Sequence, residues 1–119
     1  MFIPMKYIEI GLADTTIHRN EEICGTITVR FPGRYDGVMI NTQILNTNEH
    51  IHYTSYNDKK ISQNVARLFV SRDHMPENVV RFTALIDFET EEKREVKIRV
   101  SIIEQHKEVA SDIIFAEYL

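Results

Sequence analysis

Residues 19–31 read RNEEICGTITVRF, which is a turn followed by a run of alternating polar and apolar side chains. From Thr26 onward every second residue is apolar, so that one face carries Ile27, Val29 and Phe31 and the other carries Thr26, Thr28 and Arg30. A period of two is typical of a β-strand with one buried face. The stretch therefore predicts a half-buried strand, and it indicates a fold rather than a reaction.

The same alternation recurs along the chain, between breaks made of turn-forming residues at Pro32-Gly33, 46–48, Asn57-Asp58 and 105–107. Pro removes a backbone donor, and Gly and Asn tolerate left-handed backbone. Residues 89–93 are expected to form a charged hairpin turn. Further strands are expected at 5–12, 38–45, 50–56, 67–71, 80–88, 96–102 and 108–119. About seven or eight short strands at a spacing of roughly 8–12 residues predict an antiparallel sandwich or barrel.

The segment 59–70 supports two interpretations. Its apolar residues at 61, 65, 68 and 69 have the spacing of a helix stripe, whereas Ala66, Leu68 and Val70 alternate as in a strand. We expect a short helical turn or an irregular connection that leads into a strand at 67–71. A helix and a strand both remain open for this segment.

Length and composition indicate one all-β domain over residues 1–119, because 119 residues can bury a single core. The hydrophobic fraction of 43% and the charged fraction of 27% are ordinary for a globular protein. A net charge of -4 gives no general attraction to nucleic acid or anionic lipid.

Cellular location is predicted from absences in the sequence. Residues 1–6, MFIPMK, lack the basic region and apolar run of a signal peptide, and no stretch is long and apolar enough to span a membrane. Cys24 is the single cysteine, so no internal disulfide forms. These features predict a cytoplasmic protein, with Cys24 as a buried or half-buried small apolar residue.

Candidate chemistry is sparse. His50 and His52 lie two residues apart and would share a face of a strand, which is a spacing for metal ligands, but the sequence supplies no obvious third ligand. Two surface histidines are the simpler interpretation. The acidic residues at 87–92 are expected to be solvated, and four glycines leave no phosphate-binding loop. No enzyme activity and no cofactor are therefore predicted.

Residues 20–29, NEEICGTITV, resemble the first edge motif of arrestin-like domains. That motif has a turn, a Glu, an apolar residue and a Gly before an alternating strand, matched here by Asn20, Glu21, Ile23 and Gly25. Asn20 stands where the family usually has Gly, and Arg19 where it has Pro. Asn accepts positive φ, and Gly25 would serve a β-bulge or a close backbone approach. The segments 38–45 and 81–86 are similar to later strands of that family.

The resemblance implies an antiparallel immunoglobulin-like sandwich, one of the two that full arrestins carry. It further implies a non-enzymatic adaptor or scaffold that binds other proteins through loops and strand edges. Open edges offer unpaired backbone groups to a partner strand. The candidate edges are the N-terminal strand and residues 113–118, with Ile113, Ile114, Phe115 and Tyr118 as candidate interface residues. Apolar residues on both faces of this last strand favour a protein partner or a homodimer, although another part of the chain would serve equally well.

A second class of fold and function stays open. If 59–70 is a helix, the pattern also suits a small OB-type barrel that binds single-stranded nucleic acid. Such a barrel needs exposed aromatic and basic side chains, for which Tyr35, Tyr53, Tyr56 and Arg34 are the candidates. The acidic net charge and the additional strand after Lys107 argue against this alternative.

Overall fold

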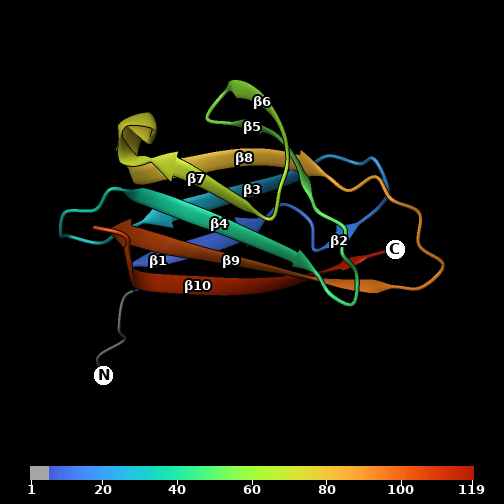
Figure 1. Ribbon diagram of the computed structural model, residues 1–119. Helices are drawn as coiled ribbons and strands as arrows, with labels where there is room; N and C mark the ends of the chain where they lie inside the picture. The colour runs from blue at the N-terminus through green and yellow to red at the C-terminus, as the bar shows by residue number, and fades with distance from the viewer. Residues whose placement is uncertain (1–5) are drawn as a thin grey trace.

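A computed structural model describes residues 6–119, which form ten strands in two five-stranded sheets (Figure 1). Sheet I has the order β1-β3-β8-β5-β6, and sheet II has the order β2-β10-β9-β4-β7. In Figure 1, β4, β9 and β10 of sheet II lie in front of β1, β3 and β8 of sheet I. The strands are β1 (Ile8–Leu12), β2 (Thr16–Ile17), β3 (Ile23–Val29), β4 (Gly37–Ile44), β5 (His52–Tyr56), β6 (Lys59–Asn64), β7 (Arg67–Ser71), β8 (Val79–Leu85), β9 (Arg94–Glu104) and β10 (Lys107–Tyr118).

All strand pairs but one are antiparallel, and the exception is the short pair of β2 with β10. The chain crosses from sheet I to sheet II between β1 and β2, because β1 pairs with β3 and β2 pairs with β10. Asp14 shapes this crossing by accepting a hydrogen bond from the backbone N–H of Thr16 (2.9 Å). The predicted all-β antiparallel immunoglobulin-like sandwich is confirmed.

The core lies between the two sheets and is built by residues at every second position. In β3, β4, β8 and β9 the inward side chains are the apolar ones that the alternation predicts. Thr42 is the polar exception, and its Oγ1 lies 2.7 Å from the hydroxyl oxygen of Tyr53, so both buried hydroxyls have a partner. The faces of the strands therefore follow from the period of the sequence.

The turn and strand at 20–29 contain two special backbone positions. Asn20 has φ 61, and its backbone N–H donates to the carbonyl oxygen of Ile86 (2.9 Å), which holds the turn against the end of β8. Gly25 lies directly opposite Phe82 in the β3–β8 ladder, and a Cβ at Gly25 would overlap the Phe82 ring. The register passes through Gly25 without a shift, so this glycine serves a close approach and not a bulge.

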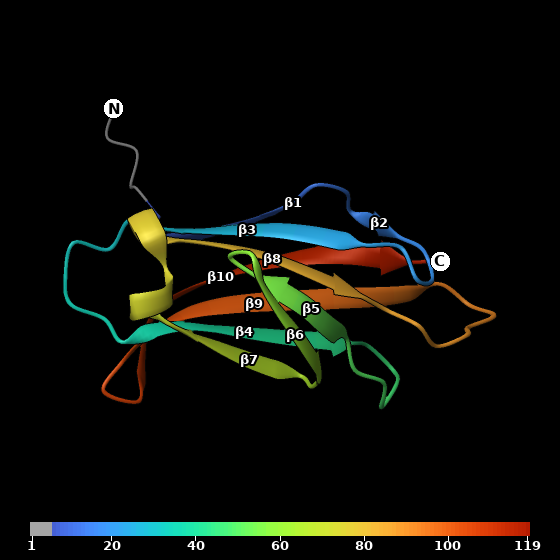
Figure 2. The same ribbon diagram turned by 90° about the horizontal axis from the view of Figure 1, so that it is seen from above.

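The segment 59–70 is not helical. Asn57 and Asp58 have φ 46 and 67, which makes a tight hairpin turn that feeds the chain into β6. A second strand, β7, then pairs with β4 in the other sheet. The β5–β6 hairpin projects from the upper side of the sandwich in Figure 1 and lies nearest the viewer in Figure 2. The structure has ten strands and not the predicted seven or eight, because the sequences of β6 and of the two-residue β2 show no clear polar–apolar alternation.

Two further local predictions are wrong. Residues 89–93 do not form a hairpin turn, because β8 belongs to sheet I and β9 to sheet II, so this segment crosses between the sheets. Cys24 is exposed instead of buried, because it has the outward parity of β3, between the buried Ile23 and Gly25. Its Sγ lies 3.3 Å from Glu22 Oε1, and this hydrogen bond is the main cause that raises the pKa of the thiol.

The remaining elements are short. Two 3₁₀ turns of three residues each follow β7, and no helix within residues 6–119 is long and apolar enough to cross a bilayer. The predicted strand at 5–12 corresponds to β1, and its expected first residue, Met5, lies outside the described residues. Most of the segment tested for a signal peptide, residues 1–5, lies outside them too.

Candidate protein-interaction edge

The last strand, β10, has one paired side and one open side. It pairs with β9 from Lys107 to Tyr118 except at Val109, whereas on the other side β2 reaches only Glu117 and Tyr118. The backbone N–H groups of Glu117 and Leu119 donate to Thr15 (2.8 Å) and Ile17 (2.9 Å), so odd-numbered residues direct their backbone away from β9. Since the direction alternates along a strand, Ser111, Ile113 and Phe115 direct their N–H and C=O groups to the open side.

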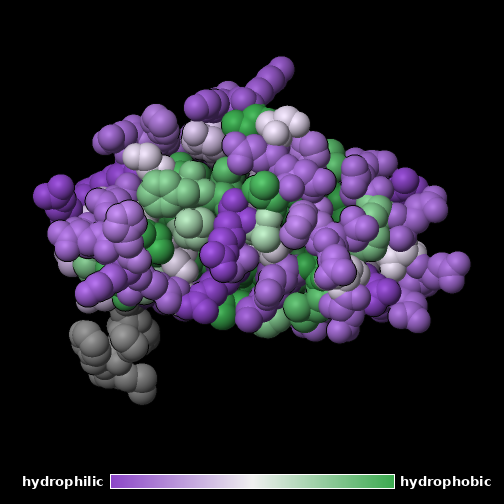
Figure 3. All heavy atoms as spheres, in the orientation of Figure 1, coloured by the Kyte–Doolittle hydropathy of each residue, from purple (hydrophilic) through white to green (hydrophobic). Residues whose placement is uncertain are grey.

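Exposed apolar side chains accompany these open backbone groups. Ile113 is 40% exposed, Phe115 is 50% exposed and Val109, in the same strand, is 40% exposed. Phe69 of β7 lies at the far side of the same sheet and is 44% exposed. Figure 3 shows this face, on which apolar side chains lie on both sides of a stripe of hydrophilic ones. Four of the seven exposed large apolar residues among residues 6–119 thus belong to sheet II.

The outer face of sheet I differs in character. Thr54, Ser55 and Thr83 gather there, and the Thr83 hydroxyl is bonded to both others, with an oxygen–oxygen distance of 2.7 Å to Thr54. Thr26 and Thr28 of β3 add further hydroxyls to the outward positions of this sheet. Because these side chains are polar, sheet I presents a polar surface that has no need of a cover. The apolar edge is a property of sheet II.

An ionic cluster fixes the start of β10 on β9. The Glu108 carboxylate accepts hydrogen bonds from Arg99 Nη2 (2.6 Å) and Ser101 Oγ (2.6 Å). These two donors, Ser101 first and Arg99 second, lower the pKa of Glu108. Directly after Glu108 the register shifts, so that Val109 is an additional residue without a partner on β9. The cluster and the bulge together place Val109 on the exposed surface.

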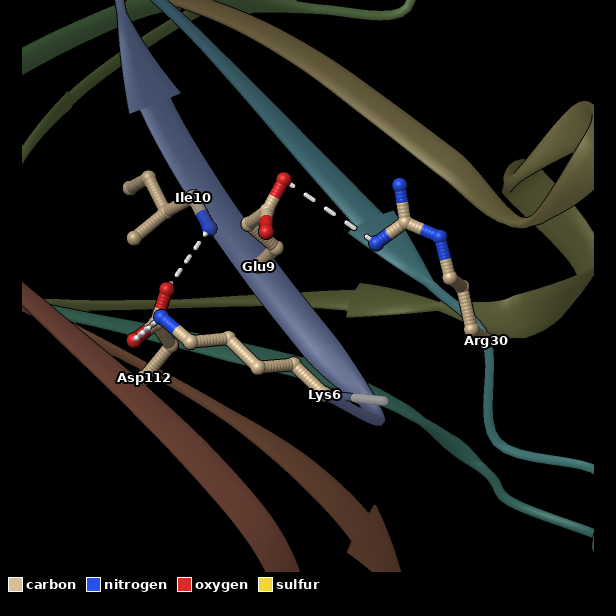
Figure 4. A network of polar contacts seen from close by, with 5 residues as sticks. All are labelled: Lys6, Glu9, Ile10, Arg30 and Asp112. Atoms are coloured by element: carbon tan, nitrogen blue, oxygen red, sulfur yellow. Dashed lines mark hydrogen bonds and ion pairs between the residues drawn. The ribbon is translucent and has the colours of Figure 1, made fainter. Parts of the chain in front are cut away.

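A second carboxylate joins the edges of the two sheets (Figure 4). Asp112 points inward from β10, and its Oδ2 accepts the backbone N–H of Ile10 in β1 (3.1 Å). Its Oδ1 lies 3.3 Å from Lys6 Nζ, while the Asp112 side chain is 13% exposed. The Ile10 N–H faces away from β3, so Asp112 occupies the central amide of the open side of β1. The N-terminal strand, the other candidate edge, is therefore partly blocked.

The four candidate interface residues separate into two pairs. Ile113 and Phe115 are exposed beside the open backbone, whereas Ile114 is half-buried and packs on the core. Tyr118 is 1% exposed, and its hydroxyl donates to the carbonyl oxygen of Phe88, so it belongs to the interior. Alternation distinguishes two faces of a strand but does not say which one is buried when both are apolar. The exposure of Val109 could not be predicted from alternation, because the β-bulge interrupts the alternating pattern before Ala110.

The structure gives the two histidines no common role. His50 is exposed and precedes β5, whereas His52 lies within β5 with its Nε2 3.1 Å from Ser62 Oγ. Among residues 6–119 no three His, Cys, Asp or Glu side chains are grouped to hold a metal ion. The pair has no third ligand in this part of the chain.

The OB-type alternative is wrong. It requires a helix within 59–70, where the chain forms β6 and β7 of two different sheets. Its aromatic candidates Tyr35, Tyr53 and Tyr56 are 3%, 0% and 8% exposed, so their rings have no free face for a base to stack on. Arg34 is exposed, but the neighbouring Tyr35 is buried and offers no stacking face.

Comparisons with known proteins bear on the fold. No protein-family model matches this chain, and no curated protein matches its sequence. Solved structures do match: a lipoprotein of Bacteroides thetaiotaomicron is 9% identical with a TM-score of 0.56, over 99% of this chain and 84% of that one. A conjugate transposon protein of Bacteroides vulgatus (residues 27–141) is 8% identical with a TM-score of 0.54, over 99% and 89% of the two chains.

The Salmonella SafD adhesin is 12% identical, with a TM-score of 0.54 over 96% of this chain and 98% of the adhesin chain. At such identities the likeness concerns the fold alone. These neighbours are small all-β domains, in agreement with the two antiparallel sheets of this chain. The chain is an antiparallel immunoglobulin-like β-sandwich.

Proposed function

We propose that this chain is a non-enzymatic protein-binding domain that works as an adaptor or scaffold. The partner adds an extended segment to sheet II at the open side of β10. One observation carries the proposal: Ser111, Ile113 and Phe115 direct their backbone groups to an open edge, beside the exposed side chains of Ile113 and Phe115. Strand addition uses such an edge, since main-chain hydrogen bonds supply affinity and alternate side chains supply selectivity.

The surroundings of the edge define where a partner segment fits. β2 closes the open stretch at Glu117, so a partner strand pairs before that residue. A hollow of about 570 Å³ adjoins this point and is lined by Thr16, Arg94 and Phe115 among others. An apolar side chain of the partner would contact the Phe115 ring there, because half of that side chain is open to solvent. Polar and charged neighbours around the hollow would form the rim of the contact.

The finer assignments belong to the same proposal. An arrestin-like relationship is supported by the left-handed turn at Asn20 and the tight packing of Gly25 on Phe82. A reducing, cytoplasmic location is supported by an exposed Cys24 that has no disulfide partner. Residues 1–119 are taken as one such domain, which agrees with a single apolar core cluster in the described part.

The test compares capture of proteins by three baits from an extract of the cells that make this protein. Wild type is compared with Ile113→Pro, which removes an open-edge N–H, and with Thr26→Gln on the outer face of sheet I. We expect wild type and Thr26→Gln to retain the same proteins and Ile113→Pro to lose them. If all three baits retain the same proteins, or if none retains any, binding at the β10 edge is contradicted.

A further inference from the structure

We propose that the domain has a second docking edge, strand β7 at the opposite margin of sheet II, and that its occupant is an acidic extended segment of another protein. This site goes beyond the proposed function, which concerns the β10 edge, and it does not rest on that function. Three observations carry the proposal. They are the open backbone of β7, an excess of cationic side chains around it, and an exposed aromatic ring within it.

The open backbone of β7 follows from its pairing with the β4 side of the sheet. The N–H of Thr42 donates to the carbonyl oxygen of Ala66 (2.8 Å), and the N–H of Arg72 donates to that of Asp36 (2.9 Å). Even-numbered residues therefore bond to this side, and β4 is the only strand beside β7 among residues 6–119 (Figure 1). The odd-numbered residues, which direct their backbone to the open side, are Arg67, Phe69 and Ser71.

The segment that carries this edge is cationic within an acidic chain. Residues 59–72, which span β6 and β7, contain four cationic side chains and no acidic one, whereas the whole chain has a net charge of -4. No ion pair within residues 6–119 involves any of the four. The four residues are Lys59, Lys60, Arg67 and Arg72. Because carboxylates of this chain do not pair with them, their charge favours an acidic partner.

Two of these residues mark the ends of the open stretch. Arg67 is exposed at the start of β7, and Arg72 directly follows its last residue. The guanidinium carbon of Arg72 lies 4.3 Å from the centroid of the buried Tyr35 ring, and the Tyr35 hydroxyl donates to Asn78 Oδ1 (2.6 Å). This stacking restrains the guanidinium, so less conformational entropy is lost when it binds a carboxylate.

An exposed aromatic ring lies between the two arginines in the sequence. Phe69 is 44% exposed, and its ring lies where a Cβ on Gly37 of the neighbouring β4 would be. The ring is therefore held over the backbone of β4 on the outer face of sheet II and keeps a free surface. An apolar side chain of a paired segment would pack beside it, as in aromatic cross-strand pairs.

A hollow beside Phe69 adds a further arginine. Its volume is about 460 Å³, and its wall includes Arg34 and Arg72. The wall also includes the carboxylates of Asp73 and Asp36, and the latter already accepts a backbone N–H from the β9–β10 turn (2.8 Å). With Arg67 at the other end, three arginines border the open stretch against these two carboxylates.

These positions define the sequence that the edge would take. A strand paired with β7 places every second side chain on the outer face, beside Arg67, Phe69 and Ser71 in turn. An acidic residue suits Arg67, and an apolar residue suits Phe69. A second acidic residue beside Ser71 would reach the Arg72 guanidinium. The resulting pattern, acidic-x-apolar-x-acidic, is the same in both chain directions. A polypeptide is favoured over nucleic acid or lipid because it alone offers backbone groups that pair with β7.

The site is tested by nuclear magnetic resonance, which detects weak binding at individual residues. The probe is a synthetic peptide with the sequence Glu-Thr-Val-Thr-Glu between Gly-Ser flanks, and its control carries Gln in place of both Glu residues. We expect the Glu peptide to shift the backbone amide signals of Phe69 and Ser71. It should bind at least about fivefold more tightly than the Gln peptide, since two exposed ion pairs are formed. Added salt should weaken the Glu peptide and not the Gln peptide.

Two double variants test which cations the peptide uses. Arg67→Gln/Arg72→Gln removes the arginines at the ends of β7, and Arg81→Gln/Lys107→Gln removes the same charge elsewhere on the surface. We expect the first to bind the Glu peptide at least about fivefold more weakly and the second to change binding less than about twofold. The amide spectrum shows whether each variant is folded, and the comparison of the two peptides on wild type depends on neither variant.

Several outcomes overturn the proposal. They are no shift at Phe69 or Ser71 with the Glu peptide in large excess, equal binding of the two peptides, shifts confined to the β10 edge, or a first double variant that binds like wild type. Oligothymidylate and phosphatidylserine vesicles are tested with the same variants. If either binds through Arg67 and Arg72 and the Glu peptide does not, the occupant is a nucleic acid or a lipid surface and not an acidic segment.

The two edges are tested independently of each other. Ile113→Pro should bind the Glu peptide like wild type, because Ile113 belongs to the β10 edge. Capture of proteins that depends on Ile113, without peptide binding at β7, overturns the second edge and leaves the proposed function in place. Peptide binding at β7 without such capture gives the reverse result.

Discussion

Gly25 and Phe82 form the tightest local fit in the opening segment. They lie opposite each other in the β3–β8 ladder, and the Phe82 ring covers the glycine. Phe82 is 1% exposed and packs against Tyr53 with ring centroids 6.2 Å apart, so its ring has no free space to move into. An aromatic ring laid over a glycine in a neighbouring strand stabilises a sheet where the glycine alone would weaken it. The absence of a side chain at residue 25 is therefore a packing requirement.

Gly25→Val should destabilise the domain by about 2 kcal/mol or more, because its Cβ overlaps the Phe82 ring in a closely packed core. The matched control is Gly11→Val in β1, since a Cβ at Gly11 meets no atom within 4 Å. Chemical denaturation measures the free energy of unfolding of each variant. The control should change it by less than about 0.5 kcal/mol. Equal stability of the two variants would remove the packing argument for Gly25.

At the scale of the element, β10 uses its two sets of backbone groups differently. Even-numbered residues such as Ile114 bond to β9, where Ile114 lies opposite Ile98, and odd-numbered residues such as Ile113 face the open side. The same alternation sends Ile114 toward the core and Ile113 to the surface. Between Ala110 and Ala116 the strand therefore supports the fold with its even-numbered residues and leaves Ser111, Ile113 and Phe115 open for contact.

Proline substitution should separate these two halves. Ile114→Pro removes a donor from the β9–β10 ladder and should cost about 3 kcal/mol or more in the free energy of unfolding. Ile113→Pro removes an N–H that has no partner in the single chain, so its cost should be clearly smaller. Thermal and urea unfolding of both variants measures the difference. Equal destabilisation would mean that Ile113 does not direct its backbone to an open side.

Glu108 makes the start of β10 sensitive to acid. Its folded-state pKa lies below the ordinary value of 4.5, so the ionised form is preferred in the folded protein. The stabilisation is therefore complete above a pH of about 4.5 and disappears as the pH falls through the folded-state pKa. Since 39% of the side chain is exposed, water screens the interaction and the effect is small.

The pH dependence can be isolated with Glu108→Gln. Wild type should be more stable than this variant near neutral pH, and the difference should shrink toward zero in acid, as urea unfolding at several pH values will measure. Glu91→Gln, in the exposed loop between β8 and β9, is the control and should show no such change with pH. A difference for Glu108→Gln that stays constant down to low pH would point to packing instead of charge.

At the scale of the whole molecule, the carboxylate of Asp112 links the two sheets at one side of the sandwich. Asp112 of sheet II accepts the N–H of Ile10 in sheet I, and neither sheet makes this bond alone. Because the Asp112 side chain is 13% exposed, the N–H would lose a partner in a mostly dry site if the carboxylate were removed. Lys6 adds less, since 62% of its side chain is open to water.

Asp112→Ala should therefore lower the free energy of unfolding by about 1–3 kcal/mol. Asp112→Asn keeps an oxygen acceptor and should lose less, and Lys6→Ala should stay within about 0.5 kcal/mol of wild type. Denaturant unfolding measures all three variants, and hydrogen exchange at the Ile10 amide reports the bond directly. Fast exchange at Ile10 in wild type would show that Asp112 does not hold this amide.

Much of the sandwich could be predicted from the sequence. The inward faces of β3, β4, β8 and β9 follow from alternation, the turn at Asn57-Asp58 follows from residues that accept left-handed backbone, and the turn at residues 105–107 follows from their polar character. These features are local, because side-chain direction depends on parity along the strand and turn geometry on a few residues. The sequence by itself therefore determined an all-β chain, its strand faces and the special backbone at Asn20 and Gly25.

Only the tertiary structure decided which strands share a sheet, and the candidate edge depends on that choice. Residues 89–93 connect the two sheets, and the successive strands β6 and β7 belong to different sheets. The pairing of β2 with β10 begins only at Glu117, which leaves Ser111, Ile113 and Phe115 of β10 open. The burial of Ile114 and Tyr118 was decided in the same way. The physical reason is that the two-residue period of polar and apolar side chains indicates only which side chains lie together on one face of a strand. Pairing and burial depend on long-range hydrogen bonds and packing between segments far apart in the chain.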